Sequence, residues 1–161
     1  MILEGRNIGQ GQTGHEAGRQ LLEQMYRSYT GREMPAIGVT EQGKPYFTRG
    51  NVQFSITHTK HHVFCALSEN PIGIDAEEVD RQIKLPLADK ILSPEEKKQY
   101  DAAEDKRRTL LTFWVLKEAA AKCTGEGIDY HPNKTNFTLP DGRVRETDGC
   151  LVAVIEQLQE K

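Results

Sequence analysis

Two stretches of the sequence carry side chains whose types and spacing suit metal and phosphate chemistry. The first, residues 73–77, reads Gly-Ile-Asp-Ala-Glu. If these residues form a strand, Asp75 and Glu77 share one face and the apolar residues occupy the other. Two adjacent carboxylates repel each other unless a cation stands between them, and Mg²⁺ prefers carboxylate oxygens while keeping sites for water or phosphate. The stretch therefore indicates either a metal-binding strand or a solvated acidic strand end.

The second stretch is a predicted long helix that begins after Asp105 and ends before Gly125. Trp114, Glu118 and Lys122 stand four residues apart, so on a helix they share one stripe. The simplest interpretation is an amphipathic helix whose Glu and Lys form an i,i+4 pair worth a few tenths of a kcal/mol. The acidic stretch upstream favours a second interpretation, in which the two charged side chains face a ligand.

Composition sets the bounds for both stretches. The chain has 161 residues, a formal net charge of −3 and a pI near 6.0, which suit one domain or two small packed halves without a basic surface for nucleic acid. Its cysteines are widely spaced and form no metal-ligand pair, which favours reduced thiols in the cytoplasm. Because no segment suits a signal peptide or a membrane span, we expect a cytoplasmic protein that binds neither nucleic acid nor membrane.

The first part of the chain predicts one helix and several short strands. Thr13 and Glu16 fit a capping box, and apolar residues then recur every four positions, so we expect a helix over residues 14–29. Short strands are expected over residues 1–8 and 37–40. Three further extended segments suit adjacent strands of an antiparallel meander: residues 52–57, 62–67 and 72–76.

The second part predicts helices, a hairpin and a final strand. Ser93 at an N-cap, Pro94 at the first helical position and Glu96 two residues on form a strong helix-start signal. The Asp-Gly pair at residues 141–142 predicts the turn of a hairpin. The elements expected here are short helices over 86–92 and 95–103, the long helix, hairpin strands at 137–139 and 144–146, and a strand over 151–155.

Together, the acidic stretch and the long helix resemble the motifs of the 4′-phosphopantetheinyl transferase superfamily. The family pattern is Gly-x-Asp, often with a Glu two residues on, followed by Trp/Phe-x-x-Lys-Glu-Ala/Ser-x-x-Lys. Here residues 73–77 carry the first motif and residues 114–122 the second, about forty residues later. Stretches that resemble the surfactin-synthetase-activating type in particular are residues 43–45, 54–59 and 125–128.

This resemblance implies a fold class and a division of the chain. The fold class is α+β: two similar α+β halves packed as a pseudo-dimer, with short antiparallel sheets and a long helix against each, and the cofactor between them. Residues 1–70 would form a shortened N-terminal half. Residues 71–161 would form the C-terminal half, which carries the metal-site motifs.

The resemblance also implies an activity and its partners. The protein would transfer the 4′-phosphopantetheine arm from coenzyme A to a serine of an apo acyl or peptidyl carrier protein. The reaction would depend on Mg²⁺ and release 3′,5′-ADP. Which carrier protein and pathway it serves is not encoded in these motifs.

By the same resemblance, each site residue receives a role. The Mg²⁺ ligands would be Asp75, Glu77 and Glu118. Residues contacting coenzyme A phosphates would be Lys44, His58 and Lys122, and residues shaping the nucleotide side would be Pro45, Ser55 and Thr57. Catalysis would rest on Asp75, on Glu118 as candidate acceptor of the serine proton and on Lys122 at the leaving phosphate. Trp114 is assigned to packing.

Two other classes of function fit the same residues. The chain could bind coenzyme A or a nucleotide without modifying a carrier protein, because its shortened first half offers few basic residues for the ligand. It could also be an adaptor that docks an acidic helix of a carrier protein. The basic residues for such docking are Arg81, Lys84, Lys106, Arg107 and Arg108.

Overall fold

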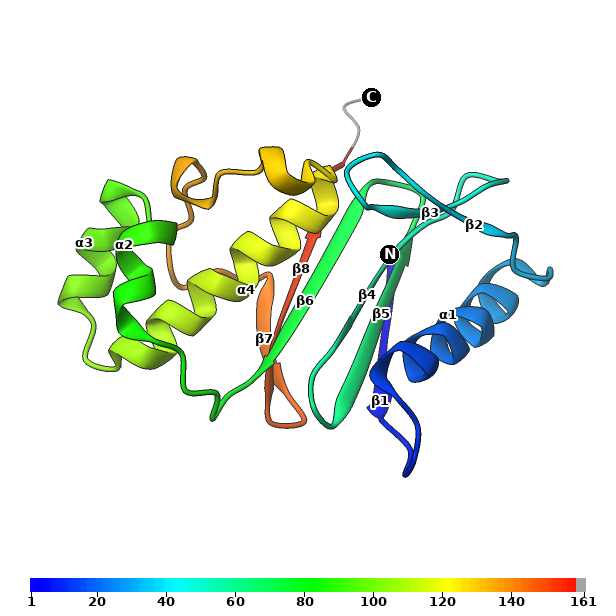
Figure 1. Ribbon diagram of the computed structural model, residues 1–161, viewed down its shortest axis with the longest axis horizontal. Helices are drawn as coiled ribbons and strands as arrows, with labels where there is room; N and C mark the ends of the chain where they lie inside the picture. Colours follow the sequence, from blue (N-terminus) through cyan, green and yellow to red (C-terminus); the bar gives the residue numbers. More distant parts are fainter. Residues whose placement is uncertain (159–161) are drawn as a thin grey trace.

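The structure is a computed structural model that describes residues 1–158, and its first unit is built from a helix and a three-stranded sheet (Figure 1). Its strands pair antiparallel in the order β1-β5-β4. The elements are β1 (Ile2–Asn7), α1 (Gly14–Thr30), β4 (Gln53–His58) and β5 (His62–Ser68). A two-stranded hairpin lies between α1 and β4 and consists of β2 (Ile37–Val39) and β3 (Pro45–Phe47).

The second unit repeats this plan with additional helices. Its strands pair antiparallel in the order β6-β8-β7. The main elements are β6 (Ile72–Glu78), α4 (Lys106–Thr124), β7 (Val144–Thr147) and β8 (Cys150–Glu156). The short helices are η1 (Leu85–Leu87), α2 (Ala88–Ile91), α3 (Pro94–Ala102), η2 (Gly127–Asp129) and η3 (Pro132–Lys134).

Both units therefore have one topology: a strand, a long helix, and two antiparallel strands of which the last is central in its sheet. The two sheets face each other, with α1 covering the outer side of one and α4 the outer side of the other (Figure 1). The predicted α+β class with two similar packed halves is confirmed. The division at residue 70 stays a prediction about folding units.

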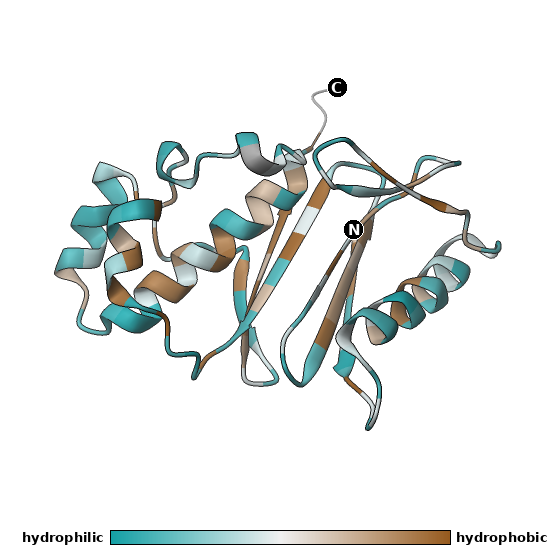
Figure 2. Cartoon of the chain, viewed as in Figure 1, coloured by the Kyte–Doolittle hydropathy of each residue, from teal (hydrophilic) through white to brown (hydrophobic). Residues whose placement is uncertain are grey.

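Apolar side chains fill the spaces between these layers. One cluster joins α1 to its sheet, a second joins α4 to β8 and the short helices, and a third lies between the sheets. The third cluster consists of Phe64, Ala66, Ile72, Ile74, Ala76, Cys150 and Val152. Hydrophobic residues accordingly follow the strands, whereas α1 and α3 show broad hydrophilic bands (Figure 2).

The predicted first helix forms with the expected cap. Thr13 is the N-cap residue, and its hydroxyl accepts a hydrogen bond from the Glu16 N–H at 3.1 Å. Gly31, with φ 70°, ends the helix in the left-handed region that favours glycine. The predicted bounds of 14–29 are confirmed within one residue, and Tyr29 in the last turn is 46% exposed.

Two predicted strand pairings are wrong. β4 and β5 pair as expected, but β6 joins the other sheet and pairs with β8, so the three segments do not form a meander. The hairpin of the second unit turns at Asp148 and Gly149, whose φ angles of 51° and 74° suit a tight hairpin turn. Within residues 137–139, by contrast, the N–H groups of Phe137 and Leu139 donate to side chains of α3.

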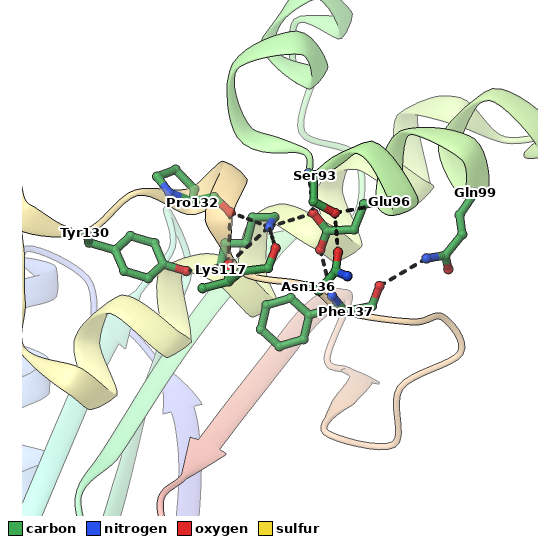
Figure 3. A network of polar contacts seen from close by, with 9 residues as sticks. Ser93, Glu96, Gln99, Lys117, Tyr130, Pro132, Asn136 and Phe137 are labelled. Atoms are coloured by element: carbon green, nitrogen blue, oxygen red, sulfur yellow. Dashed lines mark hydrogen bonds and ion pairs between the residues drawn. The ribbon is translucent and has the colours of Figure 1, made fainter.

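A buried ion pair fixes α4 to the helical layer beside it. Lys117 Nζ lies 2.7 Å from Glu96 Oε1, and the two side chains are 1% and 0% exposed. Nζ also donates to the carbonyl oxygens of Pro132 and Thr135, at 2.6 and 2.9 Å (Figure 3). One lysine thus connects α4 to α3 and to the loop that follows α4.

The carboxylate of this pair has further partners. Glu96 accepts hydrogen bonds from the backbone N–H groups of Ser93 and Phe137, each at 2.8 Å (Figure 3). The bond to Ser93 completes the capping box predicted for α3. Because both charges are desolvated and share several hydrogen bonds, removing either one leaves an uncompensated charge in the core.

We therefore expect Lys117→Met to lower the free energy of unfolding by about 3–5 kcal/mol, since Glu96 would remain buried without its cation. Lys98→Met, at an exposed position of α3, is the matched control and should change it by less than about 0.5 kcal/mol. Urea unfolding followed by circular dichroism measures both. Equal effects of the two substitutions would contradict the assigned role.

Candidate active site

The two units meet along a seam where β4 and β6 lie side by side. Side chains of β4 satisfy the backbone and the acidic residue of β6. The Ile74 N–H donates to Ser55 Oγ at 3.0 Å, and Thr57 Oγ1 donates to Asp75 Oδ1 at 3.4 Å. Ser55, Thr57 and Asp75 are all buried. The seam therefore brings together three residues that the sequence motifs place in separate stretches.

A pocket of about 570 Å³ opens between the units beside this seam. Its walls come from the turn before β3, from β4, from α4 and from the loop after α4. Residues assigned to the site from the sequence that line it are Lys44, Pro45, Ser55, Glu118 and Lys122. Five residues assigned from separate sequence stretches therefore lie on one pocket, and their individual roles stay predictions.

Gly73 allows α4 to pack directly on β6. A Cβ atom at this position would lie 2.0 Å from the Ala119 carbonyl oxygen and 2.4 Å from the Cys123 nitrogen, both backbone atoms of α4. No side chain fits in that space. The glycine of the Gly-x-Asp motif therefore sets the separation that lets Lys122 reach β6.

Lys122 and Asp75 form the centre of the site. Lys122 Nζ lies 3.1 Å from Asp75 Oδ1 and also donates to the Ile74 carbonyl oxygen at 3.1 Å. Among residues 1–158, the other carboxylate oxygen, Asp75 Oδ2, is buried without a hydrogen-bond partner. Burial raises the pKa of the Asp75 carboxyl to about 6, against the opposing effect of Lys122.

The other two acidic residues lie within electrostatic range of this pair. Burial raises the pKa of Glu118, Lys122 lowers it, and Glu77 raises it further. Both Glu118 and Glu77 also contribute to the raised pKa of Asp75. The Glu77 carboxylate is paired with the Arg81 guanidinium. Three carboxylates therefore share one region in which two protein cations balance part of their charge.

The side chains are not arranged as a finished metal centre. In the part of the chain that the structure describes, no group of three or more His, Cys, Asp or Glu side chains is placed to hold a metal ion. The observation that favours a cation is Asp75 Oδ2, because a buried carboxylate oxygen without a partner is unfavourable unless a cation or donor reaches it. The donor set of Asp75, Glu77 and Glu118 has the oxygen chemistry that Mg²⁺ prefers.

Lys44 makes a hydrogen bond that links the two units. Its Nζ donates to the Cys123 carbonyl oxygen at 2.7 Å, near the C-terminus of α4. Burial lowers the pKa of this half-buried lysine. Lys44 thus ties the first unit to the second and lines the pocket at the same time.

His58 lies away from the pocket lining. It is exposed at the end of β4, and its ring lies against the start of α1, where a Cβ atom at Gly14 would be 2.3 Å from His58 Nδ1. The structure therefore does not bring His58 together with Lys44 and Lys122. Its contact with a phosphate stays a prediction.

Sequence reasoning missed the aromatic side of the pocket. Trp114, assigned to packing, contacts the core of the second unit but also lines the pocket. Tyr130 and Pro132 line it from the loop after α4. Loop residues carry no periodic signal, so the position of Tyr130 was not accessible from the sequence, whereas Trp114 shares the stripe of Glu118 and Lys122.

Three basic residues of the adaptor hypothesis, Lys106, Arg107 and Arg108, are engaged within the fold. Lys106 Nζ donates to three carbonyl oxygens at the end of α3, those of Tyr100, Asp101 and Ala103. Arg107 donates to the carbonyl oxygens of Val79 and Arg81. Arg108 pairs with Glu146 at 2.7 Å. These contacts explain the basic turn at the start of α4 without a partner protein, and the docking role stays a prediction.

Comparison with known proteins agrees with the motifs. Residues 71–151, half of the chain, match the model of the 4′-phosphopantetheinyl transferase superfamily. The protein belongs to this superfamily, as the resemblance of the two motifs predicted.

Similar proteins are bacterial 4′-phosphopantetheinyl transferases. A 4′-phosphopantetheinyl transferase of Bacillus subtilis is 29% identical over 109 residues, which cover 66% of this chain and 48% of that protein. One of Bacillus pumilus is 30% identical over 125 residues, covering 71% and 53% respectively. The chain thus spans about half the length of these curated relatives. A solved holo-[acyl-carrier-protein] synthase of Thermotoga maritima has a TM-score of 0.46 and 22% identity, covering 53% of this chain and 61% of that one.

Within residues 1–158, none of the helices has the length and apolar character needed to cross a membrane.

Gly73→Ala should lower the free energy of unfolding by about 3 kcal/mol, because the added methyl group forces α4 away from β6. Gly142→Ala is the control, since a Cβ atom there meets nothing within 4 Å. Thermal or urea unfolding compares the two variants. A Gly73→Ala protein as stable as Gly142→Ala would show that α4 does not pack as closely as described.

Asp75 should make folding stability fall as the pH rises from about 4 to 6. In that window the folded state, with a pKa of about 6, holds a proton that the unfolded state has released, so the free energy of unfolding decreases by up to about 3 kcal/mol. Asp75→Asn should remove this contribution and flatten the curve. Urea unfolding of both proteins at a series of pH values measures the difference, and parallel curves would contradict the raised pKa.

Proposed function

We propose that the protein transfers the 4′-phosphopantetheine arm of coenzyme A to a serine hydroxyl of an apo acyl or peptidyl carrier protein, releasing 3′,5′-ADP. Family membership supports the class of reaction. The observation that carries the proposal is the pocket between the units, because it combines Lys44, Lys122 and Glu118 on its wall with the buried Asp75 behind Lys122. Cations and carboxylates in one cleft suit a ligand with a pyrophosphate and a bound metal ion.

The chemistry requires positioning and charge stabilisation. The serine oxygen attacks the β-phosphorus of coenzyme A, and the bond from that phosphorus to the bridging oxygen breaks as 3′,5′-ADP leaves. Negative charge develops on the departing phosphate, where the ammonium group of Lys122 stabilises it. Glu118 lines the same pocket and is the candidate acceptor of the serine proton.

The three carboxylates are the proposed holders of Mg²⁺. Asp75 offers the unpartnered Oδ2, Glu118 faces the pocket, and Glu77 joins them if it leaves Arg81. When bound, the ion would supply positive charge against the phosphate oxygens. Thr57 and Ser55 hold Asp75 and the backbone of β6 in place from the other unit.

The aromatic wall suits the less polar parts of the ligand. Trp114, Tyr130 and Pro132 lie on one side of the pocket, and Pro45 and Phe54 line it from the first unit. An apolar surface excludes water from the reacting phosphates and strengthens the charge interactions there. We place the enzyme in the cytoplasm, which agrees with three free, buried cysteines in the described part of the chain.

A direct assay uses the purified protein with Mg²⁺, coenzyme A and several apo carrier proteins, followed by intact mass measurement. The expected result is a carrier heavier by one phosphopantetheine arm. Binding of coenzyme A without modification of any carrier would instead establish the alternative, a coenzyme A or nucleotide-binding protein.

Substitutions test the roles within the site. Asp75→Ala and Glu118→Gln should each lower kcat at least about 100-fold, because each removes a carboxylate from the proposed metal site. Glu23→Gln, an exposed position on α1, is the control and should leave kcat unchanged. Near wild-type turnover of either site variant would refute the proposed assignment.

A further inference from the structure

We propose that Arg81 is a functional residue of this site: it is the displaceable counter-ion of Glu77, which a divalent cation replaces, and its release couples cation binding to binding of the anionic ligand. The proposal rests on the proposed function, because it takes Asp75, Glu77 and Glu118 as the oxygen donors. The residue carries no role in the two sequence motifs. Its position in the fold is what assigns one.

The contacts of Arg81 place it between the acidic residues and the pocket wall. Its guanidinium pairs with the carboxylate of Glu77, which lies four residues earlier in the chain. The Cζ atom also lies 5.7 Å from the centre of the Trp114 ring, and Trp114 lines the pocket. A single side chain therefore contacts a proposed cation ligand and a wall of the ligand pocket.

The backbone of Arg81 is held by hydrogen bonds, whereas its side chain is partly exposed. Arg107 Nη1 donates to the carbonyl oxygens of Val79 and Arg81, at 2.6 and 2.9 Å, and so fixes the turn after β6. The side chains of Arg81 and Glu77 are 41% and 22% exposed, so their ion pair is partly solvated. Such a pair is weak and exchanges readily for a stronger partner.

Two carboxylates of β6 thus each hold a protein cation: Asp75 holds Lys122 and Glu77 holds Arg81. Among residues 1–158, Asp75 keeps one buried carboxylate oxygen without a hydrogen-bond partner. A divalent cation would interact most favourably with this oxygen. Once the cation binds Glu77 as well, Arg81 loses its partner beside the pocket. A pyrophosphate group in the pocket would offer the guanidinium a new anion, so each ligand favours binding of the other.

Arg81→Gln tests the competition with Mn²⁺ as the probe, its free concentration measured by electron paramagnetic resonance. Without coenzyme A, the variant should bind Mn²⁺ about three- to fivefold more tightly than the unaltered protein, equivalent to about 0.7–1 kcal/mol. Lys84→Gln removes the same charge three residues further along and should change the affinity less than twofold. Equal changes in the two variants would overturn the proposal, since they would indicate general electrostatics.

Tryptophan fluorescence provides an independent readout, because Trp114 is the sole tryptophan of the chain. Adding Mg²⁺ should change its emission saturably in the unaltered protein as Arg81 leaves the ring, and the change should be lost or strongly reduced in Arg81→Gln. The same Mg²⁺ response in both proteins would overturn the release of Arg81 from Trp114.

The coupling is tested by repeating the Mn²⁺ titration with saturating coenzyme A. The factor by which coenzyme A tightens Mn²⁺ binding should be about three- to fivefold smaller in Arg81→Gln than in the unaltered protein. An unchanged factor would overturn the coupling even if carrier modification is observed. If the Arg81 effects appear and no carrier is modified, the proposed transfer fails while this inference stands. No Mn²⁺ binding by any of the proteins would overturn both the metal site and the role of Arg81.

Discussion

The close packing of α4 on β6 at Gly73 is the constraint on which the rest of the site depends. Backbone atoms of Ala119 and Cys123 occupy the space that a side chain at residue 73 would need. This contact brings Lys122 within 3.1 Å of both Asp75 Oδ1 and the Ile74 carbonyl oxygen. Without it, the charged stripe of the helix would face solvent, and Asp75 would lose its cation Lys122.

The same helix is held on its other side by the buried pair of Lys117 and Glu96. Two consecutive residues of α4 therefore face different parts of the molecule. Lys117 points into the helical layer, and Glu118 lines the pocket. Because residues adjacent on a helix lie about 100° apart, fixing one side chain in the core also fixes the direction of the next. Lys117 additionally holds Pro132, which lines the pocket from the loop after α4.

The site belongs to neither unit alone. Ser55 and Thr57 of β4 reach across the seam to β6, and Lys44 reaches the end of α4. Each unit has the same strand and helix order, yet the acidic motif lies on β6 and its supporting hydroxyl groups lie on β4. The pocket therefore requires the two sheets to pack face to face, and the apolar cluster between them provides that packing.

Local sequence determined the helices, their caps and the identity of the charged residues. Thr13 and Ser93 begin helices where their capping patterns predict, and the spacing of Glu118 and Lys122 places both on one stripe. These signals depend on residues three or four apart, so they are readable in the sequence. The two motifs also identified the superfamily, and five assigned residues line the pocket.

Tertiary structure decided what depends on long-range contacts. The sequence has two Asp-Gly pairs, and the pairing of β7 with β8 places the hairpin turn at Asp148 and Gly149. β6 leaves its sequence neighbour β5 and pairs with β8, because its apolar face packs between the two sheets while its acidic face meets α4. The contact of Arg81 with Trp114 likewise arises from the packing of a turn against a helix more than thirty residues away, a distance that no local pattern encodes.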